Sequence, residues 1–385
     1  MKNEWKLGPA DRTMYEALQT HVLANVLATL KESNAVHRHP YIDPGSVYEG
    51  NLWDWDSFWA SYALVNLIAP SDPRRERVLR HVRGNVLNFL DFQLPDGYIP
   101  IMVQEKDGTE PYLNARHKEG KIMNMHKPFL CQHACLYSEA AGDHSWIASR
   151  FHQIEAYFAC YDRHYFQPDI GLFVWADDVM IGMDNDPATF GRPPFSTAGL
   201  FLNAFMVAEL AAAAYLADKL GKTEAAARFA KRRTELIAAM DRECWDPRDR
   251  CYYSAVVDVK TRAFDWFHQG LGVFWKTLPI KIRTWMTFIP LWARGIAPDR
   301  AASLAEIHFP DPATFAAPWG VPSLAMDEKM YNLQPTINPS NWLGPIWLVA
   351  EYVVFRGLLD SGYRKQAEEL CLKTLRLLGN DLART

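Results

Sequence analysis

Segments with the hydrophobic periodicity of α-helices follow one another along almost the whole chain, and this pattern most restricts its fold. Neighbouring segments are joined by short turns such as Gly221-Lys222-Thr223 and Asp360-Ser361-Gly362, so they predict antiparallel helix pairs. Neither a long strand pattern nor a low-complexity linker interrupts them. We expect helices at roughly 10–32, 56–69, 74–94, 128–141, 145–162, 197–219, 222–242, 283–293, 298–307, 344–359 and 362–379.

The polar segments rich in Gly, Pro and Trp lie in the longer loops between these helices. A ring of antiparallel helix pairs would place alternate loops at one end, where they can converge on a single site. A helical solenoid is the competing arrangement, but it predicts a fixed sequence repeat that the chain lacks. The sequence therefore predicts an all-α toroid of helical hairpins, forming one domain over residues 1–385, with a short surface hairpin at 249–259.

Composition excludes several classes of function. The chain of 385 residues is 49% hydrophobic and has a formal net charge of -4, without a basic patch, so nucleic acid and anionic membranes are poor partners. No segment reaches the roughly 18 uninterrupted apolar residues of a membrane span. The 6 cysteines form no CxxC pair and show no metal-ligand spacing with histidine. We therefore expect a cytoplasmic protein with no metal and no cofactor, and the sequence leaves its oligomeric state open.

The stretch YEGNLWDWDSFW (48–59) mixes aromatic rings with carboxylates. Aromatic rings stack on the C–H faces of sugars, while carboxylates bind the hydroxyl groups. Trp53 and Trp55 are two residues apart, so they share one side if the segment enters its helix in an extended conformation. The alternative is that Asp56 only caps the helix and that both tryptophans are core residues.

Two later loops use the same residue types. In GMDNDP (182–187), Asp184 lies beside Met183 and near Trp175, and partial desolvation there would raise its pKa toward the range of a general acid. A solvated Asx turn is the alternative for this segment. In SNWLGPIW (340–347), Asn341 and Trp342 precede a strongly apolar helix, and a plain helix start with core tryptophans also explains this pattern.

Taken together, these motifs resemble the catalytic domain of family 63 glycoside hydrolases, especially the compact bacterial mannosylglycerate and glucosylglycerate hydrolases. Family 37 trehalases are more distant relatives. The matching segments occur in the order of the family and cover about residues 45 to 360. They are NLWDWDSFW (51–59), DGYIPIM (96–102), KPFLCQHA (127–134), GMDNDP (182–187), FLNAFM (201–206), PWGVPSL (318–324) and NPSNWLGPIW (338–347), which continues into YVVFRGL (352–358).

The resemblance implies an (α/α)6 barrel that hydrolyses a small α-glucoside or α-mannoside, such as glucosylglycerate or mannosylglycerate, with inversion. It implies that Asp184 is the general acid. Trp53, Trp55 and Asp56 match the subsite for the non-reducing sugar, and further lining residues are Asn185, Trp319, Gly320, Asn341, Trp342 and Trp347. Tyr48, Lys127, Gln132 and Arg192 lie in the same loops and are weaker candidates, among which a cation could hold a glycerate carboxylate.

The sequence departs from the family pattern at two places. Leu343 stands where many members have arginine, which points toward the compact subgroup. The larger departure concerns the general base, a glutamate in a late segment similar to H-E-Y-Y-x-P-x-T-G, which would begin about where the chain ends. The resemblance therefore also implies that the last helix of the barrel is missing.

Three explanations for the base are left open. The first is that the chain is a fragment, and the second is that another acid such as Glu328 has replaced the base. The third is that the protein is a non-catalytic sugar-binding relative. Glu351 lies inside an apolar helix, where a structural role is favoured. A sugar epimerase, which would use paired histidines as acid and base, is a weaker alternative. His126 and His133 are seven residues apart and could face the same side, although buried or surface histidines without catalytic roles explain them better.

Overall fold

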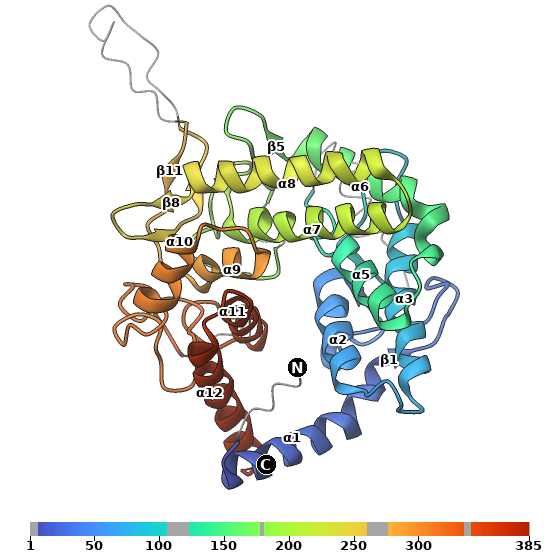
Figure 1. Cartoon of the computed structure of the whole chain (residues 1–385), viewed down its shortest axis with the longest axis horizontal. Coiled ribbons are helices and arrows are strands. Elements are labelled where there is room, and N and C mark those ends of the chain that lie inside the picture. Colours follow the sequence, from blue (N-terminus) through green and yellow to red (C-terminus); the bar gives the residue numbers. More distant parts are fainter. Residues whose placement is uncertain (1–6, 106–122, 178–180, 260–275, 335–339, 385) are drawn as a thin grey trace, which may run out of the picture. The chain divides into compact units, whose positions relative to one another are not determined.

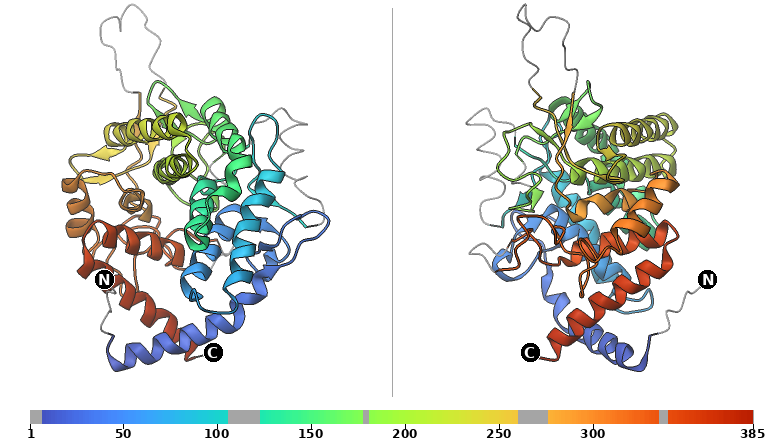
Figure 2. Two further views of the ribbon diagram at one scale, coloured as in Figure 1. Left: turned by 45° about the vertical axis from the view of Figure 1, so that its right-hand side comes forward. Right: turned by 90° about the vertical axis from the view of Figure 1, so that its left-hand side faces the viewer.

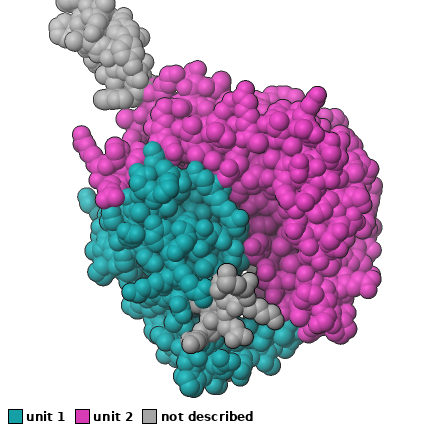
Figure 3. Space-filling view, in the orientation of Figure 1, with its two compact units in different colours: residues 1–28, 283–337, 342–385 teal, residues 29–282, 338–341 magenta. Residues whose placement is uncertain are grey.

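The computed structural model describes residues 7–105, 123–177, 181–259, 276–334 and 340–384. The chain divides into two compact units, which Figure 3 shows in different colours. Unit 1 comprises residues 1–28, 283–337 and 342–385, and unit 2 comprises residues 29–282 and 338–341. The expectation of one domain over residues 1–385 remains a prediction.

Unit 2 is built from helices that contact one another in chain order. Helix α2 packs on α3, α3 on α5, α5 on α7 and α7 on α8. The last two form a helical hairpin and lie side by side in Figures 1 and 2. The α-helices are α2 (Asp54–Leu67), α3 (Arg75–Asp91), α5 (Leu130–Ala141), α6 (Phe151–His164), α7 (Leu200–Lys219) and α8 (Thr223–Glu243), and 3₁₀ helices span Ser46–Tyr48 and Ser145–Arg150.

The strands of unit 2 are two residues long, and each described pair is antiparallel. The two-stranded ladders are β1 (Leu30–Lys31) with β2 (Tyr41–Ile42), β3 (Leu52–Trp53) with β4 (Met102–Val103), β5 (Phe166–Gln167) with β6 (Leu172–Phe173), and β8 (Trp245–Asp246) with β9 (Cys251–Tyr252). A three-stranded sheet has the order β11 (Leu278–Pro279), β10 (Ala255–Val256), β7 (Thr197–Ala198).

The surface hairpin expected at 249–259 is wrong in its pairing. Strands β9 and β10 both lie in this segment, but β9 pairs with β8, and β10 pairs with β7 and β11. The residues between Cys251 and Ala255 are also buried. The local pattern of alternating residues identified extended backbone, but β9 pairs with residues just before the expected segment, and the partners of β10 come from distant parts of the chain.

Helix α7 forms much of the core of unit 2. Phe205 on this helix packs against Phe129, with ring centroids 4.7 Å apart, and Phe129 stacks on Phe58 of α2 at 4.9 Å. By length and composition α7 could cross a membrane, with a mean hydropathy of 1.7, but 72% of its most apolar window is buried inside the structure. Its apolar surface is therefore accounted for by packing against its neighbours.

Unit 1 contains α1 (Pro9–Asn25), α9 (Ile289–Ala293), α10 (Pro298–Ser303), α11 (Leu348–Asp360) and α12 (Arg364–Leu382). Additional helical turns are Val26–Thr29 and Trp285–Phe288, both 3₁₀, and a π-helical turn at Leu304–His308. Helix α12 packs against α1, from the other end of the chain, as Figure 2 shows. Arg376 Nε lies 2.8 Å from Asp11 Oδ1, and a Cβ atom on Gly379 would lie only 2.9 Å from Met14 Cγ.

The structure shifts several helix ends from their predicted positions. Helix α1 ends at Asn25 rather than near 32, because residues 30 and 31 pair as strand β1. Helix α11 begins at Leu348 rather than at 344, because Gly344 has φ +148° and Pro345 remains in the preceding loop. Both differences arise from contacts or backbone angles that helical periodicity does not report.

Candidate active site

A buried ion pair joins the start of α2 to the segment before α5. Asp54 Oδ1 accepts a hydrogen bond from Lys127 Nζ at 2.9 Å, and its Oδ2 accepts one from the Lys127 backbone N–H at 2.7 Å. The side chains of Asp54 and Lys127 are 0% and 1% exposed. Asp54 Oδ1 also accepts the N–H of Trp55 at 2.7 Å. The NLWDWDSFW and KPFLCQHA motifs therefore meet through charge-assisted hydrogen bonds.

Trp55 lies at the centre of this region. Lys127 Nζ is 5.5 Å from the centroid of the indole, and Phe201 packs edge-on at 5.7 Å. Gly182 has φ +87°, and a Cβ atom there would lie 2.9 Å from Trp55 Cζ2. Only glycine combines this backbone angle with so close an approach. The segment that carries Asp184 is therefore held against the Trp55 indole, as convergence of alternate loops would require.

The DGYIPIM motif completes this frame. Trp53 in β3 pairs with Met102 in β4, and the Asp54 N–H donates to Ile101 O at 2.9 Å. The His126 N–H donates to Ile99 O at 2.9 Å. Backbone hydrogen bonds thus hold the residues before α5 and the start of α2 against the extended segment 99–102.

Asp56 lies in the first turn of α2, inside the helix rather than at its cap. Burial raises the pKa of Asp56 to about 6, the neighbouring Lys127 ammonium lowers it, and the Asp54 carboxylate raises it further. A hydrogen bond to the Trp55 side chain favours the ionised form. A carboxyl group with this pKa can exchange hydrogen bonds with sugar hydroxyls in either protonation state.

The GMDNDP loop contains two carboxyl groups in different surroundings. Asp184 is partly exposed, whereas Asp186 is 1% exposed and accepts a hydrogen bond from Thr189 Oγ1 at 3.0 Å. Burial raises the pKa of Asp186 to about 7, against the effect of the hydrogen bond from Thr189. Backbone bonds from Thr189 and Phe190 to Asp186 O, at 3.1 and 2.8 Å, close the turn. Asp186 therefore supports the turn, whereas Asp184 is the more exposed carboxyl group of the loop.

Asn185, the residue next to Asp184, links two motifs that are far apart in the sequence. Its Nδ2 donates to Asn341 Oδ1 at 3.1 Å, although the two residues are separated by 156 positions. Both residues belong to unit 2. The structure thus brings together the predicted site residues Asn185 and Asn341, and the GMDNDP and NPSNW motifs meet at this amide pair. Residues 338 and 339 of the latter motif lie outside the described ranges.

The weaker candidates lie at the edges of this arrangement. Tyr48 is 49% exposed and packs edge-on against Trp53 with centroids 5.9 Å apart. Gln132 Nε2 donates to Pro128 O at 2.6 Å within its own segment. Arg192 Nε donates to the hydroxyl of Thr197 at 2.9 Å, a neutral partner that does not compensate the positive charge of the guanidinium.

Sequence reasoning missed Glu209, which fixes the start of α5 from the middle of α7. Its carboxylate accepts the backbone N–H groups of Cys131 at 2.6 Å and of Gln132 at 3.1 Å. These groups at a helix N-terminus have no partner within the helix. Burial raises the pKa of Glu209 to about 7, while the two backbone hydrogen bonds lower it. Glu209 is the one acidic residue in the apolar segment 200–217, and this isolated carboxyl group is the sequence signal for a buried structural role.

In unit 1, three tryptophans form a stack. The rings of Trp342 and Trp347 are inclined by 5°, with centroids 4.2 Å apart, and the Trp285 ring stacks on Trp342 with centroids 6.2 Å apart. Trp342 is only 1% exposed, so it supports the stack from within, while Trp319 in the PWGVPSL loop is 45% exposed. Of these four tryptophans, Trp319 and Trp347 are the more exposed, so they can offer a ring surface to a ligand.

Glu351 on α11 holds the PWGVPSL loop in place through hydrogen bonds. Its Oε1 accepts the Val321 N–H at 2.8 Å, and its Oε2 accepts the Thr374 hydroxyl at 3.1 Å. A Cβ atom on Gly320 would lie 2.3 Å from Glu351 Oε2, so a side chain there would displace the carboxyl group. The structural role expected for Glu351 is therefore visible, and it positions the backbone next to Trp319.

This anchor predicts a pH-dependent stability. Burial raises the pKa of Glu351 from 4.5 to about 8, so the folded protein retains a proton that the unfolded chain releases between these values. The contribution of Glu351 to the free energy of unfolding therefore falls as the pH rises through this window and is constant above it. Glu351→Gln keeps an oxygen that accepts the Val321 N–H, and its NH2 group can donate to the Thr374 hydroxyl oxygen. We expect this variant to match the wild type near pH ~5 and to have a melting temperature several degrees higher near pH ~9.

Differential scanning fluorimetry across the pH range tests this expectation. Exposed Glu369→Gln on α12 is the matched control, since it changes the same charge without a buried carboxyl group. Parallel pH profiles for the wild type and Glu351→Gln would show that this carboxyl group does not retain its proton.

Glu328, the other candidate base, also has structural partners in unit 1. Its Oε1 accepts the Arg283 N–H at 3.0 Å and lies 3.5 Å from Arg283 Nε. The two histidines considered for an epimerase are buried. His126 Nδ1 lies 2.7 Å from Lys127 O, and His133 Nε2 lies 2.9 Å from Ser61 Oγ. Burial lowers the pKa of both, that of His133 to about 3, so they lack the properties of an exposed acid–base pair.

Comparison with known proteins identifies the family of this chain. Residues 49–383 match the family described as the mannosylglycerate hydrolase MGH1-like glycoside hydrolase domain. A probable mannosyl-oligosaccharide glucosidase of Schizosaccharomyces pombe is 24% identical over 184 residues, which are 47% of this chain and 20% of that protein. The chain therefore spans about a fifth of the length of that relative.

Solved structures with low sequence identity share the fold. A family 63 mannosylglycerate hydrolase from Thermus thermophilus, in complex with glucose, has a TM-score of 0.67 and 19% identity, covering 94% of this chain and 92% of that chain. The neutral trehalase Nth1 of Saccharomyces cerevisiae has a TM-score of 0.58 and 13% identity, covering 90% and 68%. These similarities confirm the predicted all-α fold of the (α/α)6 barrel type.

Proposed function

Because the chain belongs to the mannosylglycerate hydrolase MGH1-like glycoside hydrolase family, we propose that it hydrolyses small α-glucosides or α-mannosides with inversion at the anomeric carbon. Glucosylglycerate and mannosylglycerate are the substrates we favour. In this proposal Asp184 is the general acid that protonates the leaving oxygen. The second carboxyl group of such a mechanism activates water about 6.5–9.5 Å away.

The observation that supports the proposal most directly is the contact between Gly182 and the Trp55 indole. It holds the loop of Asp184 beside an aromatic surface of the kind that stacks on sugar rings. Asp56, with its pKa raised to about 6 by burial, is adjacent in sequence to Trp55 and suits the recognition of hydroxyl groups. Asn185 and Asn341 add a pair of amide groups next to the proposed acid.

Proton NMR of the reaction tests both the activity and its stereochemistry. We expect the β-anomer of the free sugar to appear first from glucosylglycerate or mannosylglycerate, before mutarotation equilibrates it. A first-formed α-anomer would exclude inversion, and absence of any product from either substrate or from simple α-glycosides would exclude hydrolysis.

We further propose that Arg192, rather than Lys127, binds the carboxylate of a glycerate aglycone. The ammonium of Lys127 is buried against Asp54, whereas Arg192 is partly exposed and bonded to the neutral Thr197 hydroxyl. A guanidinium group is also suited to bidentate recognition of a carboxylate. Arg192→Gln is therefore expected to raise KM for glucosylglycerate by about 10-fold or more, corresponding to the loss of one charged hydrogen bond.

Glucosylglycerol, which lacks the carboxylate, is the matched control substrate. Arg192→Gln should change its kcat/KM little, because the contact that is lost does not exist in that complex. Equal losses for both substrates would assign Arg192 to loop structure instead.

A catalytically impaired sugar-binding protein is the second candidate, and one observation favours it. Glu328 and Glu351, the two glutamates considered as the base, are each occupied with backbone N–H groups of their own unit. Differential scanning fluorimetry with glucose, mannose and the two glycerate conjugates separates the candidates. Sugar-dependent stabilisation without turnover supports the binding protein, whereas stabilisation accompanied by product supports the hydrolase.

A further inference from the structure

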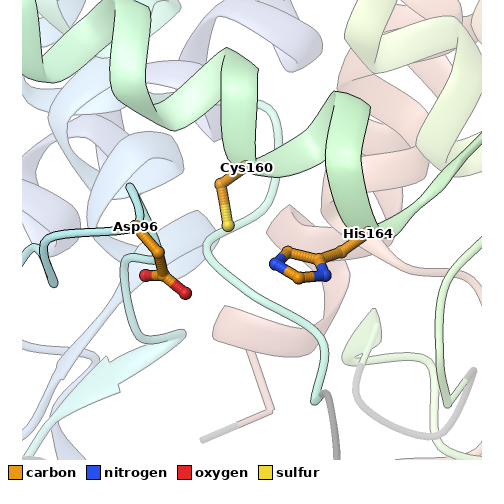
Figure 4. Close-up of side chains that lie close together, drawn as sticks. All are labelled: Asp96, Cys160 and His164. Carbon is orange, nitrogen blue, oxygen red and sulfur yellow. The ribbon is translucent and has the colours of Figure 1, made fainter.

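Three potential metal ligands meet at the C-terminal end of α6, outside the residues assigned to saccharide recognition. They are Asp96, in the turn that follows α3, and Cys160 and His164 on α6. One ligand atom from each residue lies within 4.8 Å of the others. Figure 4 shows the Cys160 sulfur between the Asp96 carboxylate and the His164 ring, with all three side chains directed toward a common region.

The sequence contains a signal for this cluster in the spacing of two of its members. Cys160 and His164 are four residues apart, so they lie on the same face of α6. This spacing presents a sulfur and a nitrogen ligand side by side, contrary to the expectation that the cysteines show no metal-ligand spacing with histidine. Asp96 is 64 or more positions earlier, and only the tertiary structure brings it to this face.

The turn that carries Asp96 is fixed against α6. Gly97 has φ +92°, and a Cβ atom there would lie 1.9 Å from Ala156 O and 3.2 Å from Cys160 Cβ. The backbone of this turn therefore touches the helix directly. Asp96 Oδ1 accepts the Tyr98 N–H at 3.1 Å, which orients the carboxylate at the start of the turn. The ligands thus lie on backbone whose position is determined before any ion binds.

The local charges also suit a cation. Cys160 and His164 occupy the last turn of α6, where the partial negative charge of the helix C-terminus stabilises positive charge. Arg163 Nη1 donates to the backbone carbonyl of Asp96 at 3.5 Å, which ties the turn to the end of α6. Cys160 is 0% exposed, so its sulfur is shielded from bulk solvent while Asp96 and His164 remain partly accessible.

We propose that Asp96, Cys160 and His164 bind one Zn²⁺ ion, with water as the fourth ligand. A thiolate, an imidazole and a carboxylate form a ligand set that Zn²⁺ commonly uses. Zinc–ligand bonds of about 2.0–2.3 Å place tetrahedral ligand atoms roughly 3.3–3.8 Å apart. The three ligand atoms lie within 4.8 Å of one another, so small side-chain rotations bring them to these distances. Binding releases the thiol proton of Cys160 to solvent, and oxidation states do not change.

The ion joins the turn after α3 to the end of α6, both within unit 2. It therefore stabilises the folded protein, because the ligands are separated in the unfolded chain. This role differs from hydrolysis of the glycosidic bond, which this site does not touch, so the two proposals can fail independently.

The first measurement uses the whole native chain after removal of metal with a chelator. We expect elemental analysis to find one Zn²⁺ per chain after reconstitution and gel filtration, and the melting temperature to rise with added Zn²⁺. Co²⁺ should replace Zn²⁺ and give the near-ultraviolet charge-transfer absorption of a thiolate ligand together with the visible bands of tetrahedral coordination. A Co²⁺ complex without thiolate absorption would overturn the proposal.

Variants assign the ligands. Cys160→Ser and His164→Gln should each weaken Zn²⁺ binding by at least about 100-fold, beyond the 10- to 100-fold typical of lost outer-shell partners. Asp96→Asn retains an oxygen that accepts the Tyr98 N–H, so the turn should keep its conformation. This variant should also weaken Zn²⁺ binding. The matched control is Cys244→Ser, since Cys244 is a buried cysteine on another helix end. Unchanged affinity in Cys160→Ser, or an equal loss in Cys244→Ser, contradicts the site.

Discussion

Asp184→Asn is expected to lower kcat for glucosylglycerate or mannosylglycerate by about 10²–10⁴-fold, the range typical of general acid catalysis. The amide has nearly the same size as the carboxyl group but cannot donate the proton that the leaving alkoxide requires. KM should change much less, because sugar recognition is proposed to rest on Trp55, Asp56 and their neighbours.

The leaving group provides the sharpest test of this role. Fluoride leaves the anomeric carbon of a glycosyl fluoride without needing a proton from an acid. Asp184→Asn should therefore retain far more of its activity on the glycosyl fluoride than on the glycerate conjugate. Equal losses on both substrates would indicate that Asp184 positions the substrate rather than donating a proton. Product analysis by NMR and initial-rate kinetics give the required comparison.

Asp186→Asn is the control from the same loop. Asp186 is buried, and burial raises its pKa to about 7, so an amide reproduces much of its neutral form. We expect this variant to keep kcat within about 10-fold of the wild type, since the turn it supports accepts an amide oxygen in place of the carboxyl oxygen. If Asp186→Asn instead shows the leaving-group dependence, the general acid is Asp186.

Lys127→Met is expected to destabilise the protein by about 3–5 kcal/mol, the cost of leaving one member of a buried ion pair without its partner. The Lys127 ammonium and the Asp54 carboxylate are 1% and 0% exposed, so water cannot replace the lost contact without local rearrangement. Because Lys127 also lies 5.5 Å from the Trp55 ring centroid, the variant should bind sugar more weakly as well.

A double-mutant cycle separates the buried charge from the loss of packing. Adding Asp54→Asn to Lys127→Met removes the uncompensated carboxylate and should recover part of the lost free energy of unfolding. Lys231→Met is the matched control, because Lys231 forms an exposed pair with Glu235 at 3.9 Å and should change stability by less than about 1 kcal/mol. Urea unfolding followed by circular dichroism measures each variant. Similar destabilisation in Lys127→Met and Lys231→Met would contradict the importance of the buried pair.

The buried acids near the proposed site were the least predictable from the sequence. The motif pattern points to Asp56, whereas Asp54 forms the ion pair at the start of α2. The sequence pattern gives no sign that Asp186 supports its turn or that Glu209 binds the start of α5. The roles of Asp54 and Glu209 are set by partners more than 70 positions away in the sequence, whereas Asp186 bonds to the nearby Thr189 and only its burial depends on the rest of the fold.

The sequence by itself determined the helical class, most helix positions and the motifs of the family, because periodicity and short motifs are local properties. It also identified the tryptophan and asparagine loops that the structure shows in contact, such as Gly182 against Trp55 and Asn185 with Asn341. Only the tertiary structure decided which acids are buried, which tryptophans are supports and how Asp96 reaches Cys160 and His164. Burial and ligand geometry depend on contacts between distant segments, and local sequence patterns do not specify those contacts.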